Sequence, residues 1–150
     1  MTENKLIFKD YNETYFDECL VLFDKNCPAY FAPDEREDYI EFLKSKSKVY
    51  KIGFIKHQVV AVFGFDIDLQ TKRARITWIM TCPSMHAKGL GSEMMLYAKK
   101  MAIAHQIIII DIAASHLSAP FFKKFGAKAI GEIKDGWGLN IDRIDMELLL

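Results

Sequence analysis

The stretch CPSMHAKGLGSEMMLYAKK, residues 82–100, decides the fold of this chain. An apolar, strand-like run ends at Pro83, a short turn of small and basic residues carries Gly89 and Gly91, and a long amphipathic helix follows. The first turn of a helix has unpaired N–H groups and about half a positive charge, which suits a phosphate. Because glycine has no Cβ, a phosphate can approach its backbone closely. We therefore expect residues 83–92 to hold a phosphate-bearing ligand.

The composition limits the classes of protein to which the chain can belong. Its 150 residues suit one domain with one core, and 51% of them are apolar. Lys plus Arg and Asp plus Glu each number 20, which argues against general nucleic-acid binding and against a basic membrane anchor. The start MTENKLIFKD lacks the apolar region of a secretory signal, and no apolar run is long enough to span a membrane. We expect one domain over residues 1–150, located in the cytoplasm, with no nucleic-acid or membrane partner.

The three cysteines, Cys19, Cys27 and Cys82, indicate reduced thiols rather than disulfides. Their number is odd, and none has the spacing to another cysteine or to a histidine that a metal site requires. Reduced thiols are typical of a cytoplasmic protein, and we expect no metal ion. Cys82 stands beside the glycine turn, where it is either a reactive thiol or a small packing residue.

The apolar patterns predict strands and helices that build one mixed sheet. The expected helices cover residues 14–25, the segment after Pro33, 90–105 and 118–125. The expected strands cover residues 6–11, 49–56, 59–68, 73–82, 107–113, 127–133 and 141–150. The segment NCPAYFAPDE between the first two helices is rich in proline and aromatic residues, so we expect an ordered loop there. The predicted fold class is α/β (α+β), with a mixed, mostly antiparallel central sheet and helices on both faces.

Three of these segments carry more detailed predictions. Residues 73–82 alternate, and the residues on one face are Ala74, Ile76, Trp78 and Met80. The run IIIIDIA, residues 107–113, is almost entirely β-branched and fits a strand buried on both faces, as in a parallel pair. Because a helix separates these two strands, we expect a right-handed crossover between them. The last two strands are expected to join through a turn at residues 135–138.

Two motifs are informative in combination. HAKGLG, residues 86–91, follows a strand and opens a helix, and FFKKFGA, residues 121–127, comes after the next strand. In these motifs and in its order of elements, the whole chain resembles the GNAT superfamily of acyl-CoA-dependent N-acyltransferases, whose diagnostic motif is Arg/Gln-x-x-Gly-x-Gly/Ala. The places of a second, downstream family pattern are held here by Ser115, Ser118, Phe121, Phe122, Gly126 and Ala127. The resemblance implies that the two parallel strands splay apart to form a cleft.

The resemblance implies acetyl-CoA as a co-substrate. The backbone amides of residues 87–92 would hold its pyrophosphate, and its pantetheine arm would pair with the main chain of residues 79–81. The residues expected to bind the coenzyme are Ile79, Met80, Thr81, His86, Ala87, Lys88, Gly89, Leu90, Gly91, Ser92, Ser115 and Phe122. Lys123 and Lys124 either meet the nucleotide phosphate or belong to a solvated helix face.

The chain departs from the family pattern at the groups that move protons. The family's tyrosine is replaced by Phe122, its strand glutamate by the neighbourhood of Thr77 and Trp78, and its leading Arg or Gln by His86. His86 can still donate to a phosphate, or it is a surface turn residue. The substitute candidates for catalysis are Asp111, Ser115 and His116. The alternative interpretation is structural, with Asp111 a satisfied carboxylate and His116 a hydrogen-bonding group at a helix start.

The acceptor site is expected between the first two helices and the final hairpin. Its candidate residues are Tyr30, Phe31, Trp78 and Trp137, and Asp34 and Glu35 add carboxylates nearby. Aromatic rings with carboxylates suit a cationic amine. The alternative is that Tyr30 and Phe31 only attach their loop to the core.

The sequence therefore predicts an N-acetyltransferase that moves an acetyl group from acetyl-CoA to a primary amine by direct attack in a ternary complex. The acceptor, a small molecule or a peptide amine, is left open, as is the use of other acyl groups. The alternative is a non-catalytic acyl-CoA-binding or sensing module, which the missing tyrosine and glutamate favour. The C-terminal IDMELLL either forms a homodimer by pairing with a second subunit or finishes the sheet.

Overall fold

The computed structural model describes residues 5–46 and 48–150, except for the side chains of residues 86–88. The strands are β1 (Ile7–Asp10), β2 (Tyr50–Ile55), β3 (Gln58–Asp68), β4 (Arg73–Thr81), β5 (Ile109–Ser115), β6 (Lys128–Gly138) and β7 (Ile141–Leu149). The α-helices are α1 (Phe16–Lys25), α2 (Glu35–Lys44), α3 (Leu90–Ala104) and α4 (Ala119–Lys123), with 3-10 turns at Glu13–Tyr15 and Pro83–Lys88. Every predicted helix and strand is present, and their ends are shifted by a few residues.

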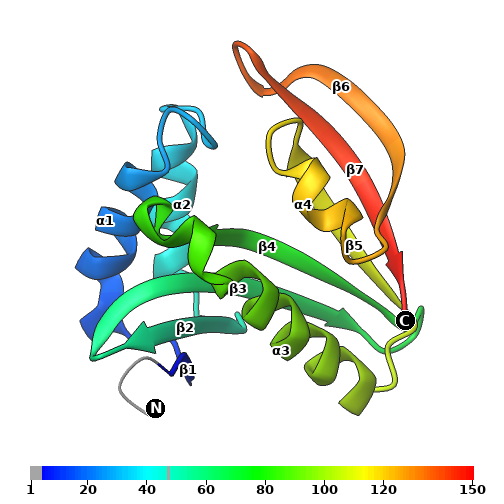
Figure 1. Cartoon of the computed structure of the whole chain (residues 1–150), viewed down its shortest axis with the longest axis horizontal. Helices are drawn as coiled ribbons and strands as arrows, with labels where there is room; N and C mark the ends of the chain where they lie inside the picture. The colour runs from blue at the N-terminus through cyan, green and yellow to red at the C-terminus, as the bar shows by residue number, and fades with distance from the viewer. Residues whose placement is uncertain (1–4, 47) are drawn as a thin grey trace.

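The strands form one sheet in the order β1-β2-β3-β4-β5-β7-β6 (Figure 1). All neighbouring pairs are antiparallel except β4 and β5, which run parallel and are joined through α3. The predicted mixed, mostly antiparallel sheet with one parallel pair is therefore confirmed. No helix in the described part of the chain is long and apolar enough to cross a membrane.

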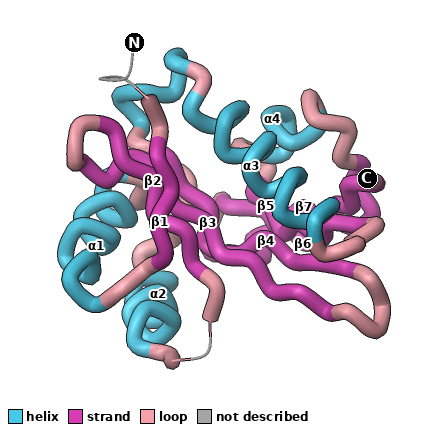
Figure 2. The backbone as a smooth tube through the Cα atoms, turned by 90° about the horizontal axis from the view of Figure 1, so that it is seen from below, coloured by secondary structure: helices cyan, strands magenta, loops and turns pink. Residues whose placement is uncertain are grey.

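Helices cover both faces of the sheet, as predicted. Figure 2 shows α3 and α4 on one side and α1 and α2 on the other. On the α3 side, Phe63 of β3 packs edge-on against Phe65 and Tyr97. On the α2 side, the ring of Tyr39 packs against those of Phe23 and Tyr50, and all three side chains are fully buried. Aromatic burial on both faces fixes the sheet between its helices.

The alternation predicted for residues 73–82 is wrong at Trp78. The register of β4 with β3 shifts between Thr77, which lies opposite Gly64, and Met80, which lies opposite Val62. Trp78 has a φ of 48°, and its ring packs against Tyr39 of α2. An extra residue of this kind is a β-bulge, which turns side chains to the other face and bends the strand.

Two other predictions are corrected near the C-terminus. Residues 135–138 belong to β6, and the hairpin turns at residues 139–140 instead. Residues 134–137 have no register partner between the pairs Ile133–Arg143 and Gly138–Ile141, so they bulge out of the ladder. In β5, only the face of Ile110 and Ile112 is buried, whereas Ile109 and Asp111 on the other face are half-exposed. The parallel pairing is right, but the burial of both faces is not.

We expect replacement of Ile110 by alanine to destabilise the fold strongly. The side chain is fully buried in β5, and loss of an isoleucine from a core costs about 2–5 kcal/mol of unfolding free energy. Ile108→Ala is the matched control, because Ile108 belongs to the same run but is 52% exposed, and its loss should stay within about 0.5 kcal/mol. Urea denaturation followed by circular dichroism measures both, and equal losses would contradict the assignment of the buried face.

Candidate functional site

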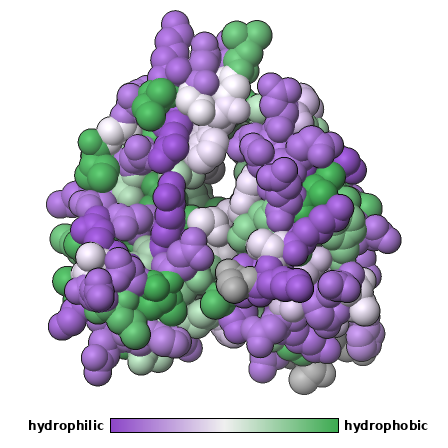
Figure 3. Space-filling model, turned by 180° about the vertical axis from the view of Figure 1, so that it is seen from behind, coloured by the Kyte–Doolittle hydropathy of each residue, from purple (hydrophilic) through white to green (hydrophobic). Residues whose placement is uncertain are grey.

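The site begins where β4 and β5 separate. These strands pair only from Arg73 to Ile76 on β4 and from Ile109 to Ile112 on β5, and beyond that point they diverge (Figure 1). A cavity of about 630 Å³ extends through the opening between them. From behind, the space-filling view shows a deep hollow in this face of the molecule (Figure 3). Elements on both faces of the sheet contribute residues to the lining of this cavity.

On the α3 side, the start of the helix borders the cavity. Gly89 has a left-handed φ of 77°, and a Cβ placed on it would meet nothing within 4 Å. The amide of Glu93 donates to the carbonyl of Gly89 at 3.1 Å, so the amides of Leu90 to Ser92 have no acceptor inside the helix. Gly89, Gly91 and Ser92 line the cavity. This is an open, positively polarised helix end that faces the cavity.

Gly91 also makes room for a neighbouring helix. A Cβ placed on it would lie 2.7 Å from the ring of Phe121 in α4. The absence of a side chain therefore lets α4 pack directly on the first turn of α3. Phe121 and the buried Phe122 both line the cavity, as does Lys124 just after the helix.

The bulged end of β4 is held by side chains from other elements. The hydroxyl of Tyr50 donates to the carbonyl of Trp78 at 2.8 Å, and the side-chain amide of Asn26 donates to the carbonyl of Thr81 at 3.1 Å. Asn26 Nδ2 also donates to the carbonyl of Leu22 at 2.9 Å, which fixes it to the end of α1. These partly buried bonds satisfy carbonyls at the bulged end of the strand. Sequence reasoning missed both residues, because only the folded chain brings them to β4.

A buried hydroxyl pair supports the same carbonyl. The oxygens of Tyr39 and Tyr50 lie 2.9 Å apart, and burial raises the pKa of Tyr50 well above its usual value. Because Tyr50 donates its proton to Trp78, Tyr39 supplies the other hydrogen bond of the pair. Neither hydroxyl is a proton source at neutral pH, and their role here is to hold the backbone.

The four residues predicted for the acceptor site all line the cavity. The ring of Phe31 stacks on that of Trp78, with centroids 5.9 Å apart. Trp137 donates its indole N–H to the carbonyl of Ala114 at 3.0 Å, and the guanidinium of Arg143 lies 5.2 Å from its ring centre. Tyr30 completes this aromatic wall.

Glu35 is a buried acid that faces the same space. Its side chain is 8% exposed and lines the cavity, and its Oε2 accepts a hydrogen bond from the amide of Ala32 at 2.8 Å. Burial raises the pKa of Glu35 to about 7, although the bond from Ala32 opposes this shift. The hairpin tip closes on this corner, because a Cβ on Gly138 would lie 2.5 Å from that of Ala32. The sequence indicated a first-turn carboxylate near the acceptor, but not its burial.

The three candidates for catalysis are dispersed. Asp111 accepts two hydrogen bonds from Arg73, at 3.0 and 2.6 Å, and Arg73 also pairs with Glu147. This cluster lies at the closed end of the strand pair, and Asp111 does not line the cavity. The placement favours the structural interpretation of Asp111.

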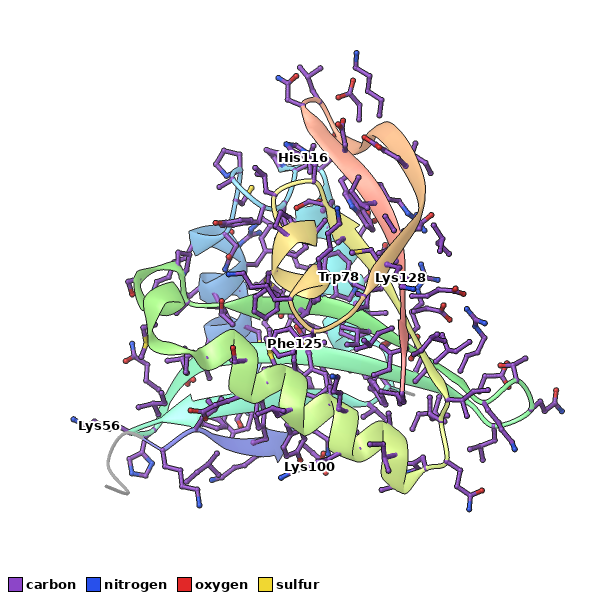
Figure 4. The ribbon with its side chains drawn as sticks, turned by 45° about the vertical axis from the view of Figure 1, so that its right-hand side comes forward. Lys56, Trp78, Lys100, His116, Phe125 and Lys128 are labelled. Atoms are coloured by element: carbon purple, nitrogen blue, oxygen red, sulfur yellow. The ribbon has the colours of Figure 1, made fainter. Side chains whose placement is uncertain are left out.

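Ser115 is the last residue of β5, and His116 lies just beyond it. In Figure 4, Trp78 lies at the centre of the molecule, whereas His116 lies towards the end that carries the β6–β7 hairpin. His116 is exposed, and its Nδ1 accepts a hydrogen bond from the amide of Asp142 at 3.1 Å. Ser115 does line the cavity, but its hydroxyl already accepts the amide of Ser118 at 3.1 Å at the start of α4.

The predicted coenzyme residues fall into three groups. Those that line the cavity are Ile79, Met80, Thr81, Gly89, Gly91, Ser92, Ser115 and Phe122. Leu90 is buried beside them and does not line it. The side chains of His86, Ala87 and Lys88 lie outside the described part of the structure.

The chain belongs to the acetyltransferase (GNAT) family. The model of that family matches residues 12–127, which contain the glycine turn, the splayed strands and α4. The predicted family is thereby confirmed. No curated protein sequence matches the chain.

Solved structures show the same fold at low sequence identity. A GNAT-family acetyltransferase from Desulfovibrio desulfuricans superposes with a TM-score of 0.80 at 14% identity, covering 97% of this chain and 99% of its own. The ribosomal-protein-S18-alanine N-acetyltransferase from Escherichia coli superposes with a TM-score of 0.80 at 10% identity, covering 97% of this chain and 94% of its own. An aminoglycoside 6'-N-acetyltransferase complexed with coenzyme A superposes with a TM-score of 0.75 at 14% identity, covering 95% of this chain and 96% of its own.

We expect Tyr50→Phe to destabilise the protein by about 1–3 kcal/mol, because it removes the buried hydroxyl that donates to the partly buried carbonyl of Trp78. Tyr97→Phe is the matched control, since no hydrogen bond of the Tyr97 hydroxyl occurs among the described residues and its ring packing is kept. Thermal unfolding of the two variants measures the difference. Equal stabilities would show that the bond to Trp78 does not hold the bulge.

Proposed function

We propose that the protein is an N-acetyltransferase that transfers the acetyl group of acetyl-CoA to a primary amine by direct attack in a ternary complex. One observation carries this proposal: a single cavity joins the open start of α3 to the aromatic wall through the gap between β4 and β5. Such a passage lets two substrates meet from opposite faces of the sheet. We extend the proposal to residues 1–150 as one N-acetyltransferase domain.

The start of α3 fits the pyrophosphate of the coenzyme. Gly89 leaves its surroundings open, and the amides of Leu90 to Ser92 are available as donors. Hydrogen bonds to a charged group contribute about 1.5–3 kcal/mol each, so several of them outweigh the ordering of a flexible ligand. Lys124 lines the same side of the cavity and adds a positive charge. The coenzyme-bound neighbour supports coenzyme binding by this fold.

The free edge of β4 is the group we assign to the acyl end. From Thr77 to Thr81 this strand has no partner on the β5 side, and its bulge is fixed by Tyr50 and Asn26. Acetyl-CoA supplies the acetyl group as a thioester, whose carbonyl becomes more negative during attack. Fixed backbone donors stabilise that charge without reorganising, and positioning of the two reactants supplies much of the remaining acceleration.

The alternative is a non-catalytic module that binds or senses acyl-CoA. It is favoured by Phe122, which lines the cavity without an acidic proton where the family often carries tyrosine. Release of free thiol from acetyl-CoA in the presence of a primary amine separates the two functions. Turnover supports the enzyme, whereas saturable coenzyme binding without turnover across a broad amine panel supports the module.

We expect Gly89→Asp to weaken acetyl-CoA binding at least tenfold relative to Gly89→Asn. Both side chains tolerate the left-handed φ of 77° and have nearly the same size, so they differ mainly in charge. A carboxylate at the helix start repels the pyrophosphate and competes for its amides, and the difference should shrink at high salt. Isothermal titration calorimetry gives both affinities. Equal affinities, or no saturable binding to the unsubstituted protein, would overturn the assignment of this turn.

A further inference from the structure

Two carboxylates line the described part of the cavity, and only one of them is buried. Asp66 is exposed on β3 and lies opposite Arg75 in the ladder, so a cation from the chain is close to it. Glu35 is buried, and no ion pair among the described residues includes it. A buried carboxylate needs a compensating partner or a proton. None of the described residues supplies a cation to Glu35.

The two oxygens of Glu35 have different surroundings. Oε2 accepts the amide of Ala32 at 2.8 Å, which fixes the carboxylate at the start of α2. Oε1 accepts no hydrogen bond from the described residues. Glu35 lines the cavity, so its carboxylate borders that space. One oxygen therefore holds the group in place, and the other is available to the cavity.

We propose that Glu35 binds the protonated primary amine of the acceptor and takes up one of its protons before attack. This inference rests on the proposed acetyl transfer and identifies the proton acceptor that the family glutamate would otherwise provide. A proton passes from R–NH3+ to the Glu35 carboxylate, which leaves R–NH2 with a free electron pair. The nitrogen then bonds to the acetyl carbon, and the C–S electron pair leaves with the sulfur. The coenzyme thiolate takes the second nitrogen proton, and Glu35 releases the first to water.

The surroundings of Glu35 suit an ammonium group. The stacked rings of Phe31 and Trp78 and the indole of Trp137 line the same cavity, and aromatic faces attract cations. An amine enters along this wall with its charge directed at the free oxygen. The pocket therefore selects a primary ammonium over a neutral or anionic group of the same size.

The charged neighbours of Glu35 agree with a base that works near neutral pH. Burial raises its pKa to about 7, the amide of Ala32 lowers it, and Asp38 on the same helix raises it. From the loop before α2, the thiol of Cys27 interacts with Glu35, and burial raises the pKa of that thiol. Asp66 and Arg75 face the cavity from the sheet. A bound ammonium is the missing positive charge, and it will lower the pKa of Glu35 and favour its ionised form.

The Glu35→Gln variant separates the charge of Glu35 from its role as a helix cap. Because the pKa of Glu35 is raised by folding, the folded state holds more protons than the unfolded state between pH 4.5 and about 7. Its contribution to stability therefore falls as the pH rises through that window. Glutamine keeps an oxygen for the amide of Ala32 and cannot ionise. We expect Glu35→Gln to be at least as stable as the unsubstituted protein at pH 8, with a weaker pH dependence of its melting temperature.

The first experiment needs no turnover. Binding of n-butylamine to the protein saturated with coenzyme A is measured by calorimetry at pH 8, with n-butanol as the uncharged analogue. Glu35→Gln should weaken n-butylamine at least tenfold and leave n-butanol unchanged. Glu37→Gln is the matched control, because it makes the same chemical change on an exposed residue of the same helix turn, and should bind as the unsubstituted protein does.

The second experiment follows thiol release from acetyl-CoA with n-butylamine between pH 5.5 and 9. Removal of a general base typically lowers the rate about 10²–10⁴-fold, so Glu35→Gln should lower kcat in that range and leave the KM for acetyl-CoA unchanged. It should also remove the rise in kcat/KM near pH 7 that the unsubstituted protein and Glu37→Gln show.

The outcomes separate this inference from the function on which it rests. If the unsubstituted protein fails to bind acetyl-CoA, the acetyl transfer itself is wrong. If acetyl-CoA binds but n-butylamine binds equally well to Glu35→Gln, binds nowhere, or reacts at an unchanged rate, then Glu35 is only a helix cap. Selective loss of the ammonium with retained coenzyme affinity and stability supports the proposal.

Discussion

The site depends on one interruption of hydrogen bonding, the end of the β4–β5 ladder after Ile76 and Ile112. Two parallel strands that part inside a protein leave backbone groups that must find other partners or remain costly. Side chains from distant segments supply them here: Tyr50 donates to the carbonyl of Trp78, Asn26 to that of Thr81, and Trp137 to that of Ala114. Specific hydrogen bonds therefore hold the two strands where they part, and two of the three donors, Asn26 and Trp137, also line the cavity.

Most of the fold could be predicted because local sequence patterns specify its helices and strands. Periodicity gave each strand and helix, and the glycine turn between the fourth strand and the long helix placed the parallel crossover. The bulge at Trp78 could not be predicted, because a strand with a β-bulge and a regular strand have the same apolar alternation. What produces it is tertiary: the small Gly64 opposite Thr77 and the hydroxyl of Tyr50 on the Trp78 carbonyl. The hairpin turn was misplaced for a similar reason, since Asp135 and Gly136 resemble turn residues but belong to a strand bulge.

Some residues of the candidate site could be predicted from the sequence and others could not, and the difference has a physical reason. Residues that act through the backbone or through bulk, such as Gly89 and the aromatic acceptor residues, follow from motif position and were brought to the cavity. The role of a charged residue depends on which charged groups pack against it in the folded chain. Asp111 stands in a plausible strand position, yet Arg73 occupies its carboxylate, whereas Glu35 is buried and forms no ion pair with any described residue. No property of a single chain position distinguishes these two acids before the elements are packed.

The charges around the cavity give its two ends opposite character. At the α3 end, unpaired helix amides and Lys124 provide positive potential without an acidic group among the described lining residues of that side. At the α2 end, the lining carries Glu35 and Asp66, and Arg75 beside Asp66 offsets part of their charge. Charges that face a partly enclosed space are screened less than those on an open surface, so this asymmetry acts over the length of the cavity. This asymmetry supports the proposed arrangement, in which an anionic coenzyme and a cationic amine approach from different faces and meet where the strands part.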